Sequence, residues 1–155
     1  MIKLILTNPE DSRGEFLKCV KNSGKNILLV ISSNPHNEIK DKLKIICKNK
    51  KCVYINTFSE SADKDTVYIH PSNLTALSIA INQAQQSFTG KVDIIFDSIS
   101  YLAINNDPSI LTRFFLFLIK KSKDWGSDIT IILSKKADEQ MIEVLGETAD
   151  QVKKI

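Results

Sequence analysis

Short, continuous apolar runs, separated by stretches with helical spacing, constrain the fold of this chain most strongly. The clearest runs are NILLVI at 26–31, the first half of VDIIFDSISYL at 92–102, and DITIIL at 128–133. A strand that is buried on both faces reads as such a run, because neither of its faces meets water. Strands that alternate with helices favour an α/β fold with a mostly parallel central sheet and helices on both faces.

The remaining elements follow from turn residues and periodicity. We expect further strands at 1–6, 52–56 and 66–69, and a polar surface loop at 59–64. Helices are predicted after Pro9, after Pro35, over 74–88 and after Pro108, since proline and its polar neighbours favour a helix start. A closing helix is predicted from 137 onwards and should stop at Gly146. A chain of 155 residues of this kind predicts one domain, residues 1–155.

Composition and charge exclude some classes of protein and leave others open. The chain is 43% hydrophobic and 25% charged, which is ordinary for a globular protein and not typical of a disordered one. Its net charge of +3 is spread over scattered lysines, so nucleic acid is neither required nor excluded as a partner. The longest apolar run, 114–119, falls far short of the roughly 20 residues of a membrane span, and we expect no membrane partner.

The three cysteines favour a reducing, cytoplasmic setting. Cys19, Cys47 and Cys52 are an odd count, and their spacings fit neither a CxxC metal ligand pair nor a disulfide framework. The apolar N-terminal segment is too short for a signal peptide core. We therefore expect a reduced, cytoplasmic setting for the protein.

Polar residues follow the predicted strands at the edge of the sheet where ligands usually bind. Asp97 and Ser98 come directly after the run at 92–96. In open α/β sheets, ligands bind just beyond the carboxyl ends of the strands. The candidate ligand-binding residues that we expect to converge there are Ser33, Asn34, His36, Asp97, Ser98 and Lys135.

Each candidate also has an interpretation without a ligand. Asp97 either contacts a ligand or metal, or bonds neighbouring backbone N–H groups, and the second role is the commoner one. Ser98 is favoured as a turn residue over a nucleophile, because His36 and His70 are the only histidines and neither is placed in sequence to activate it. Both histidines with Asp97 could bind zinc, but strand ends often come together without metal. We expect no catalytic residue, no bound metal and no cofactor.

The predicted helix after Pro108 is apolar around its whole circumference. Residues 114–119 read FFLFLI, and six consecutive residues at about 100° each cover every side of a helix. The surrounding loops and helices could bury them all within the monomer. Alternatively, part of this surface forms a protein interface, since large exposed apolar patches are usually contact sites. The interface candidates are Phe114, Phe115, Leu116 and Phe117.

Three segments together resemble a known superfamily. VDIIFDSISYL, the preceding CVYINTFSES and the following DITIILSKKADEQM look like the core of a RecA-superfamily domain of the KaiC-like type, common in archaea. The resemblance covers residue 26 to the end and implies a three-layer sandwich. It implies that Asp97 corresponds to the Walker B aspartate, which helps hold nucleotide-bound magnesium. Glu60 lies near the place of the catalytic acid, although out of register with it.

The segment after NILLVI departs from that family. A phosphate loop needs glycines whose N–H groups turn around the oxyanions, followed by a lysine and a hydroxyl. This chain has SSNPHNEIKDKL there and no glycine between Lys25 and Thr89. Glu38 would place a negative charge in the cradle and repel phosphate by about 1 kcal/mol or more. On this point the chain is similar to P-loop-less relatives of KaiC, including the sensory domain called MEDS.

These observations lead to one functional expectation and two alternatives. The lost phosphate loop and the apolar helix favour a non-catalytic KaiC-like domain that serves protein association or signalling, with a protein partner or a homo-oligomer. A residual nucleotide-binding domain that uses Asp97 is the first alternative, although the resemblance makes nucleotide an unfavoured ligand. A pseudo-receiver signalling domain is the second, because receivers also carry an aspartate at a strand end but need an acidic pair that Ile31-Ser32-Ser33 does not supply.

Overall fold

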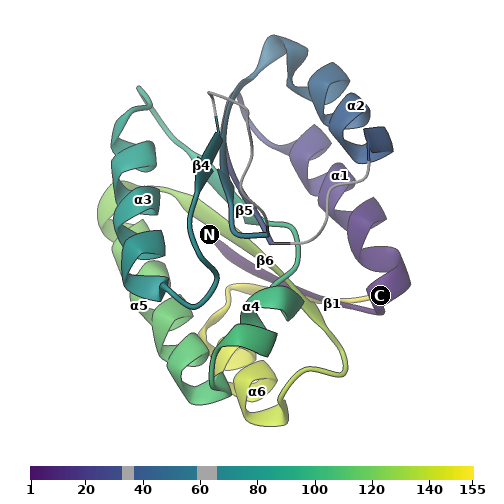
Figure 1. Cartoon of the computed structure of the whole chain (residues 1–155), viewed down its shortest axis with the longest axis vertical. Helices are drawn as coiled ribbons and strands as arrows, with labels where there is room; N and C mark the ends of the chain where they lie inside the picture. Colours follow the sequence, from purple (N-terminus) through teal and green to yellow (C-terminus); the bar gives the residue numbers. More distant parts are fainter. Residues whose placement is uncertain (33–36, 59–65) are drawn as a thin grey trace.

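A computed structural model places seven strands in one sheet and describes residues 1–32, 37–58 and 66–155 (Figure 1). The strand order is β4-β3-β2-β5-β6-β1-β7, and every pairing between neighbours is parallel. The strands are β1 (Ile2–Thr7), β2 (Asn26–Ile31), β3 (Lys51–Asn56), β4 (Thr66–Tyr68), β5 (Asp93–Phe96), β6 (Asp128–Ser134) and β7 (Gln151–Lys154).

Helices cover both faces of this sheet. The α-helices are α1 (Ser12–Asn22), α2 (Asn37–Ile46), α3 (Leu74–Gln86), α4 (Ser100–Asn105), α5 (Pro108–Trp125) and α6 (Glu139–Thr148), with short 3₁₀ turns η1 (Pro9–Asp11) and η2 (Cys47–Asn49). Helices α1 and α2 pack together on one face, while α3, α5 and α6 lie on the other (Figure 1). The chain is therefore a three-layer α/β sandwich, as the strand–helix alternation predicts.

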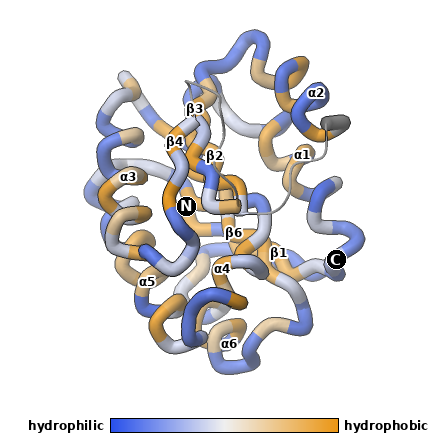
Figure 2. Tube along the Cα trace, in the orientation of Figure 1, coloured by the Kyte–Doolittle hydropathy of each residue, from blue (hydrophilic) through white to orange (hydrophobic). Residues whose placement is uncertain are grey.

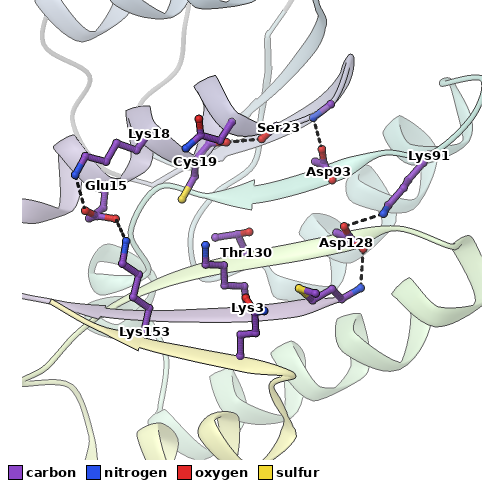
Figure 3. A pocket seen from close by; sticks show the side chains of 14 residues that line it. Lys3, Glu15, Lys18, Cys19, Ser23, Lys91, Asp93, Asp128, Thr130 and Lys153 are labelled. Atoms are coloured by element: carbon purple, nitrogen blue, oxygen red, sulfur yellow. Dashed lines mark hydrogen bonds and ion pairs between the residues drawn. The ribbon is translucent and has the colours of Figure 1, made fainter.

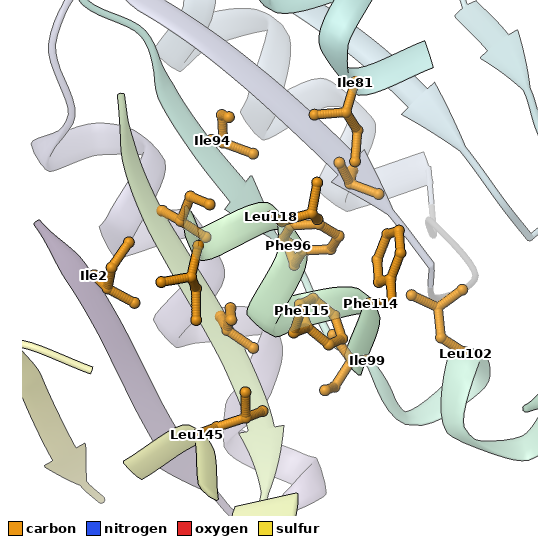
Figure 4. Packing of buried hydrophobic residues seen from close by; sticks show 14 of the residues in the cluster. Ile2, Ile81, Ile94, Phe96, Ile99, Leu102, Phe114, Phe115, Leu118 and Leu145 are labelled. Carbon is orange, nitrogen blue, oxygen red and sulfur yellow. The ribbon is translucent and has the colours of Figure 1, made fainter. Parts of the chain in front are cut away.

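Two hydrophobic cores hold the layers together. The larger core joins the sheet to α3, α5 and α6, and Phe96 of β5 packs edge-on against Phe115 of α5 at 5.1 Å between ring centroids (Figure 4). The smaller core joins the other face to α1 and α2 through Phe16, Val20 and Leu43. The central strands β1, β2 and β6 accordingly show hydrophobic segments in the trace, whereas the helices mix hydrophobic and hydrophilic segments (Figure 2).

Local sequence signals set several helix ends. Asn73 accepts a hydrogen bond from the N–H of Ala76 at 3.0 Å and so caps α3, and Asp138 caps α6 through the N–H of Met141. Pro108 occupies the first turn of α5. Gly126 ends that helix with φ of +67°, a left-handed conformation that favours glycine.

One predicted helix end is wrong, two elements are not predicted from the sequence, and the loop predicted at 59–64 lies outside the described residues. Helix α6 continues through Gly146 to Thr148, because a glycine in a helix only lowers its stability and the neighbouring residues Met141 and Leu145 are buried against the core. Strand β7 has no apolar run, since its residues QVKK are all exposed at the edge of the sheet. Helix α4, at the end of the segment 92–102, was also not expected as a separate helix.

Most of the apolar stretch of α5 is buried within the monomer. Phe115 is fully buried and Phe114 is 8% exposed, and both belong to the larger core. Leu116 is half-buried, and Phe117 alone among the four interface candidates is substantially exposed, at 48%. Because the sheet, α3, α4 and α6 cover the other sides of α5, Phe114 and Phe115 are buried within the monomer, and the interface candidates as a set stay a prediction.

The cysteine prediction also needs correction. Cys47, in the turn after α2, forms a disulfide with Cys52 on β3, which leaves Cys19 as a free cysteine. A spacing of five residues does not by itself indicate a disulfide. The pairing depends on the turn η2 between the two cysteines, which brings their Cα atoms to 6.2 Å. No helix within the described residues is both long and apolar enough to cross a membrane.

Candidate functional site

Asp97 lies directly beyond β5, at the edge of the sheet where the strands end. Its backbone N–H donates to the carbonyl of Val30 on β2 at 3.2 Å, which continues the pairing of the two strands. The side chain is 6% exposed. The parallel register of β2 and β5 therefore places the carboxylate beside the turn that leaves β2.

The Asp97 carboxylate bonds the backbone on both sides of it. Oδ1 accepts hydrogen bonds from the N–H of Ser32 at 2.8 Å and from the N–H of Ser98 at 2.7 Å. Bonds from backbone N–H groups to an ionised carboxylate are among the stronger hydrogen bonds in proteins. This is the backbone-bonding role that the sequence analysis gave as the commoner alternative for Asp97.

Further polar groups at this edge also bond to one another. Ser32 and Thr57 are fully buried, and the Thr57 hydroxyl donates to Oγ of Ser32 at 3.0 Å. The N–H of Thr57 donates to the carbonyl of Ile31 at 2.9 Å, while Oδ1 of Asn56 accepts from the N–H of Phe58. These bonds join the ends of β2 and β3, so the edge beside Asp97 is a bonded polar layer.

Of the other predicted site residues, Ser98 follows Asp97 directly and bonds it, and the rest lie apart from Asp97 or outside the described part of the chain. Ser33, Asn34, His36 and Glu60 fall within the segments that the structure does not describe. Ser98 is half-buried, and its hydroxyl contacts that of Ser100 at 3.2 Å. Lys135 is exposed after β6, and its N–H donates to the carbonyl of Thr7 on β1.

His70 also has a local role. It is exposed at the end of β4, two strands away from β2, and its Nδ1 lies 2.7 Å from the hydroxyl of Ser72. Among residues 1–32, 37–58 and 66–155, no cluster of three or more histidine, cysteine or acidic side chains could hold a metal ion. The zinc alternative includes His36, which lies outside the described residues, so it stays untested.

A second candidate site lies at the opposite edge, where the strands begin. A groove of about 470 Å³ runs between α1 and the amino ends of β5, β6, β1 and β7 (Figure 3). Four lysines and three acidic residues line it: Lys3, Lys18, Lys91, Lys153, Glu15, Asp93 and Asp128. Sequence reasoning did not find this groove.

Most charges in the groove are paired. Glu15 of α1 is 8% exposed in its side chain and lies 3.4 Å from Lys18 and 3.6 Å from Lys153 of β7. Asp93 accepts a hydrogen bond from the N–H of Gly24 at 2.7 Å. Asp128 bonds Lys91 at 2.9 Å. These contacts link α1, β5, β6 and β7 around the groove (Figure 3).

Three groups in the groove have shifted pKa values, and the first is Lys91, whose hydrogen bond to Asp128 raises its pKa. Partial burial works to raise the pKa of Asp128, but hydrogen bonds from the Met1 amino group and from Lys91 outweigh it and hold the pKa below its ordinary value. Burial raises the pKa of the Cys19 thiol, despite the opposing charge of Lys3. Cys19 is therefore a protonated thiol near neutral pH, with its sulfur on the groove side of α1 (Figure 3).

One signal in the sequence points to this groove. In the first strand, MIKLIL, alternation puts Lys3 on the same face as Ile5, which is fully buried. A lysine on the inner face of a parallel strand conflicts with the rule that both faces of such a sheet are buried. The register of β1 with β6 and β7 shows why Lys3 is tolerated there: it lies beside Thr130 and Gln151 on the part of the sheet that lines the groove.

Comparisons with known proteins bear on the fold. No family model matches the chain, and no curated protein matches it. The chain is similar to a protein of Pyrococcus horikoshii OT3 solved in a structural study, with a TM-score of 0.58 and 14% identity over 99% of this chain and 81% of that one. At this identity the likeness shows the α/β fold alone.

Proposed function

We propose that this chain is a non-catalytic α/β domain that acts by associating with protein, in the manner of a scaffold or signalling module. The observation that carries the proposal is the bonding of Asp97. Its Oδ1 atom is held by two backbone N–H groups, from Ser32 and Ser98, in a site that is 6% exposed. A carboxylate so held stabilises the ends of two strands, which is a structural role.

The sequence beyond β2 supports the same proposal. The chain has no glycine between Lys25 and Thr89, so the segment after β2 lacks the residues that let backbone N–H groups surround a triphosphate. Only the resemblance to KaiC-like domains suggests that Asp97 belongs to a nucleotide site. Without a phosphate loop, Asp97 has no nucleotide-bound magnesium to hold.

Exposed apolar residues on α5 support association with protein. Ile110 is 45% exposed and Phe117 is 48% exposed. They are seven residues apart and so lie on the same side of the helix, two turns from each other. A second copy of the chain is the partner to test first, because closed homodimers are the commonest protein assemblies.

A nucleotide titration tests the non-catalytic half of the proposal. Calorimetry with ATP and magnesium should give no binding heat, and a phosphate-release assay should give no turnover above the buffer rate. ATP hydrolysis that is lost in Asp97→Asn would overturn this half, because it would assign the carboxylate to a metal or a reacting water.

Light scattering on a sizing column tests the association half. We expect a mass above that of one chain, and a monomer for Phe117→Glu. Ile45→Glu is the matched control, because Ile45 is 75% exposed on α2, on the opposite face of the sheet. A wild-type monomer at every concentration, or equal masses for both variants, would contradict self-association through α5.

A further inference from the structure

The floor of the groove at the amino edge is a polar row across three strands. Lys3 of β1 is in register with Thr130 of β6 and with Gln151 of β7. Residues in register on neighbouring parallel strands point to the same face of a sheet. All three line the groove, beside the α1 residues Glu15 and Cys19 (Figure 3).

Lys3 is the unmatched charge on this floor. Its side chain is half-buried, and within residues 1–32, 37–58 and 66–155 it has no hydrogen bond and no ion pair. The neighbouring acids are already engaged, Glu15 with two lysines and Asp128 with Lys91. A half-buried ammonium group has lost part of its hydration and gains more from an anion than an exposed one does.

We propose that this groove binds a small molecule that carries an oxyanion, a carboxylate or a phosphate, with the oxyanion placed on the ammonium group of Lys3. The hydroxyl of Thr130 and the amide of Gln151 are the hydrogen-bonding groups beside Lys3 in the same row. A volume of about 470 Å³ is that of a typical small-molecule site.

The charges around the groove set the orientation of such a ligand. Asp93 and Asp128 are paired in register at the start of β5 and β6, and two carboxylates there repel an oxyanion. Lys153 lies on β7, the neighbour of β1 on the side away from β6, two residues after Gln151. Lys153 is already paired with Glu15, so the oxyanion belongs on Lys3 itself, with the neutral or amino part of the ligand toward Asp93.

Titration with two probes tests the site and separates the two kinds of oxyanion. Inorganic phosphate and malonate are titrated separately, and binding is followed by amide chemical shifts. We expect shifts at residues around Lys3 and Thr130 that saturate with at least one probe, and the tighter probe identifies the ligand class. The absence of saturable shifts with both probes would overturn the proposal.

Substitution of Lys3 gives the matched comparison. Lys3→Met removes the charge but keeps an unbranched chain, and it should weaken binding about tenfold, the effect of one lost charged hydrogen bond. Lys120→Met, an exposed lysine of α5 on the other face of the sheet, should bind as the wild type does. Lys3→Arg keeps the charge and should retain binding even if Lys3→Met fails to fold. Equal affinities for Lys3→Met and wild type would refute the role of Lys3.

Cys19 provides an independent readout, because it is a free thiol on the groove wall while Cys47 and Cys52 are joined. Iodoacetate is an anion and iodoacetamide is neutral, so Lys3 should favour iodoacetate at Cys19. Lys3→Met should lower the iodoacetate-to-iodoacetamide rate ratio by several fold, and the tighter probe should slow both reactions. A ratio that is unchanged by Lys3→Met, with no protection by either probe, would count against the proposal.

Discussion

The Oδ1 atom of Asp97 lies 2.8 Å from the backbone nitrogen of Ser32, and this one bond joins the ends of β5 and β2, 65 residues apart in the chain. The same oxygen accepts a hydrogen bond from the N–H of Ser98, so a single carboxylate holds the backbone at the points where β2 and β5 leave the sheet. This edge is where an α/β fold usually binds its ligand. Here the acidic residue at this edge bonds the backbone at the ends of two strands.

Removal of that carboxylate should destabilise the protein. Asp97→Ala leaves the buried N–H of Ser32 without its acceptor, and we expect a loss of about 1–3 kcal/mol in the free energy of unfolding. Asp97→Asn keeps an oxygen acceptor and should lose less. Urea denaturation measures both, with Asp124→Ala on exposed α5 surface as the control. If Asp97→Ala had the same unfolding free energy as the wild type, the two hydrogen bonds would contribute nothing to stability.

Substitutions of two aromatic residues of α5, Phe115 and Phe117, should lower stability by very different amounts. Phe115→Ala removes a fully buried ring that packs on Phe96 and Phe114, and should cost about 3–5 kcal/mol in unfolding free energy. Phe117→Ala should cost less than about 1 kcal/mol, since its ring is 48% exposed and contacts Lys121. Chemical denaturation at low protein concentration measures both, and similar losses would contradict the packing of α5.

The ammonium group of Lys50 should stabilise α1 from outside that helix. Its Nζ donates to the carbonyls of Val20, Lys21 and Ser23 at 2.9–3.0 Å, at the end where helix carbonyls lack partners. Lys50→Met should lower the unfolding free energy by about 1–2 kcal/mol. Lys48→Met, an exposed neighbour, is the control for denaturation measurements. Equal stability of the two variants would argue against this capping role.

The pairing of Asp128 with Lys91 and the Met1 amino group predicts a pH dependence. Because the folded pKa of Asp128 lies below its ordinary value of 3.8, its stabilising contribution is complete above that value and is lost as the pH falls through the lower folded pKa. Asp128→Asn should therefore be less stable than the wild type at neutral pH, and the difference in unfolding free energy should be smaller at about pH 3. Urea midpoints at both pH values measure this, and a deficit independent of pH would contradict the ion pair.

The sequence predicted the strands that carry apolar residues, including β4 at one edge of the sheet, but not β7 at the other edge. NILLVI and DIIF are recognisable because both their faces are buried, and the order of strands and helices follows from them. Strand β7 has no such signal, because an edge strand with exposed residues has no need of apolar side chains. Its place is fixed by pairing with β1, which is a contact over about the whole length of the chain.

The same distinction applies to the candidate sites. Position at a strand end was readable for Asp97, but which of its two roles it takes depends on the N–H of Ser32, and so on the pairing of β2 with β5. The groove around Lys3 needs the register of three strands and the crossing of α1 over β5 and β6. Local periodicity determined the elements and the buried faces, because each depends on near neighbours. Only the tertiary structure decided which polar groups meet, because those groups are brought together by pairing between distant segments.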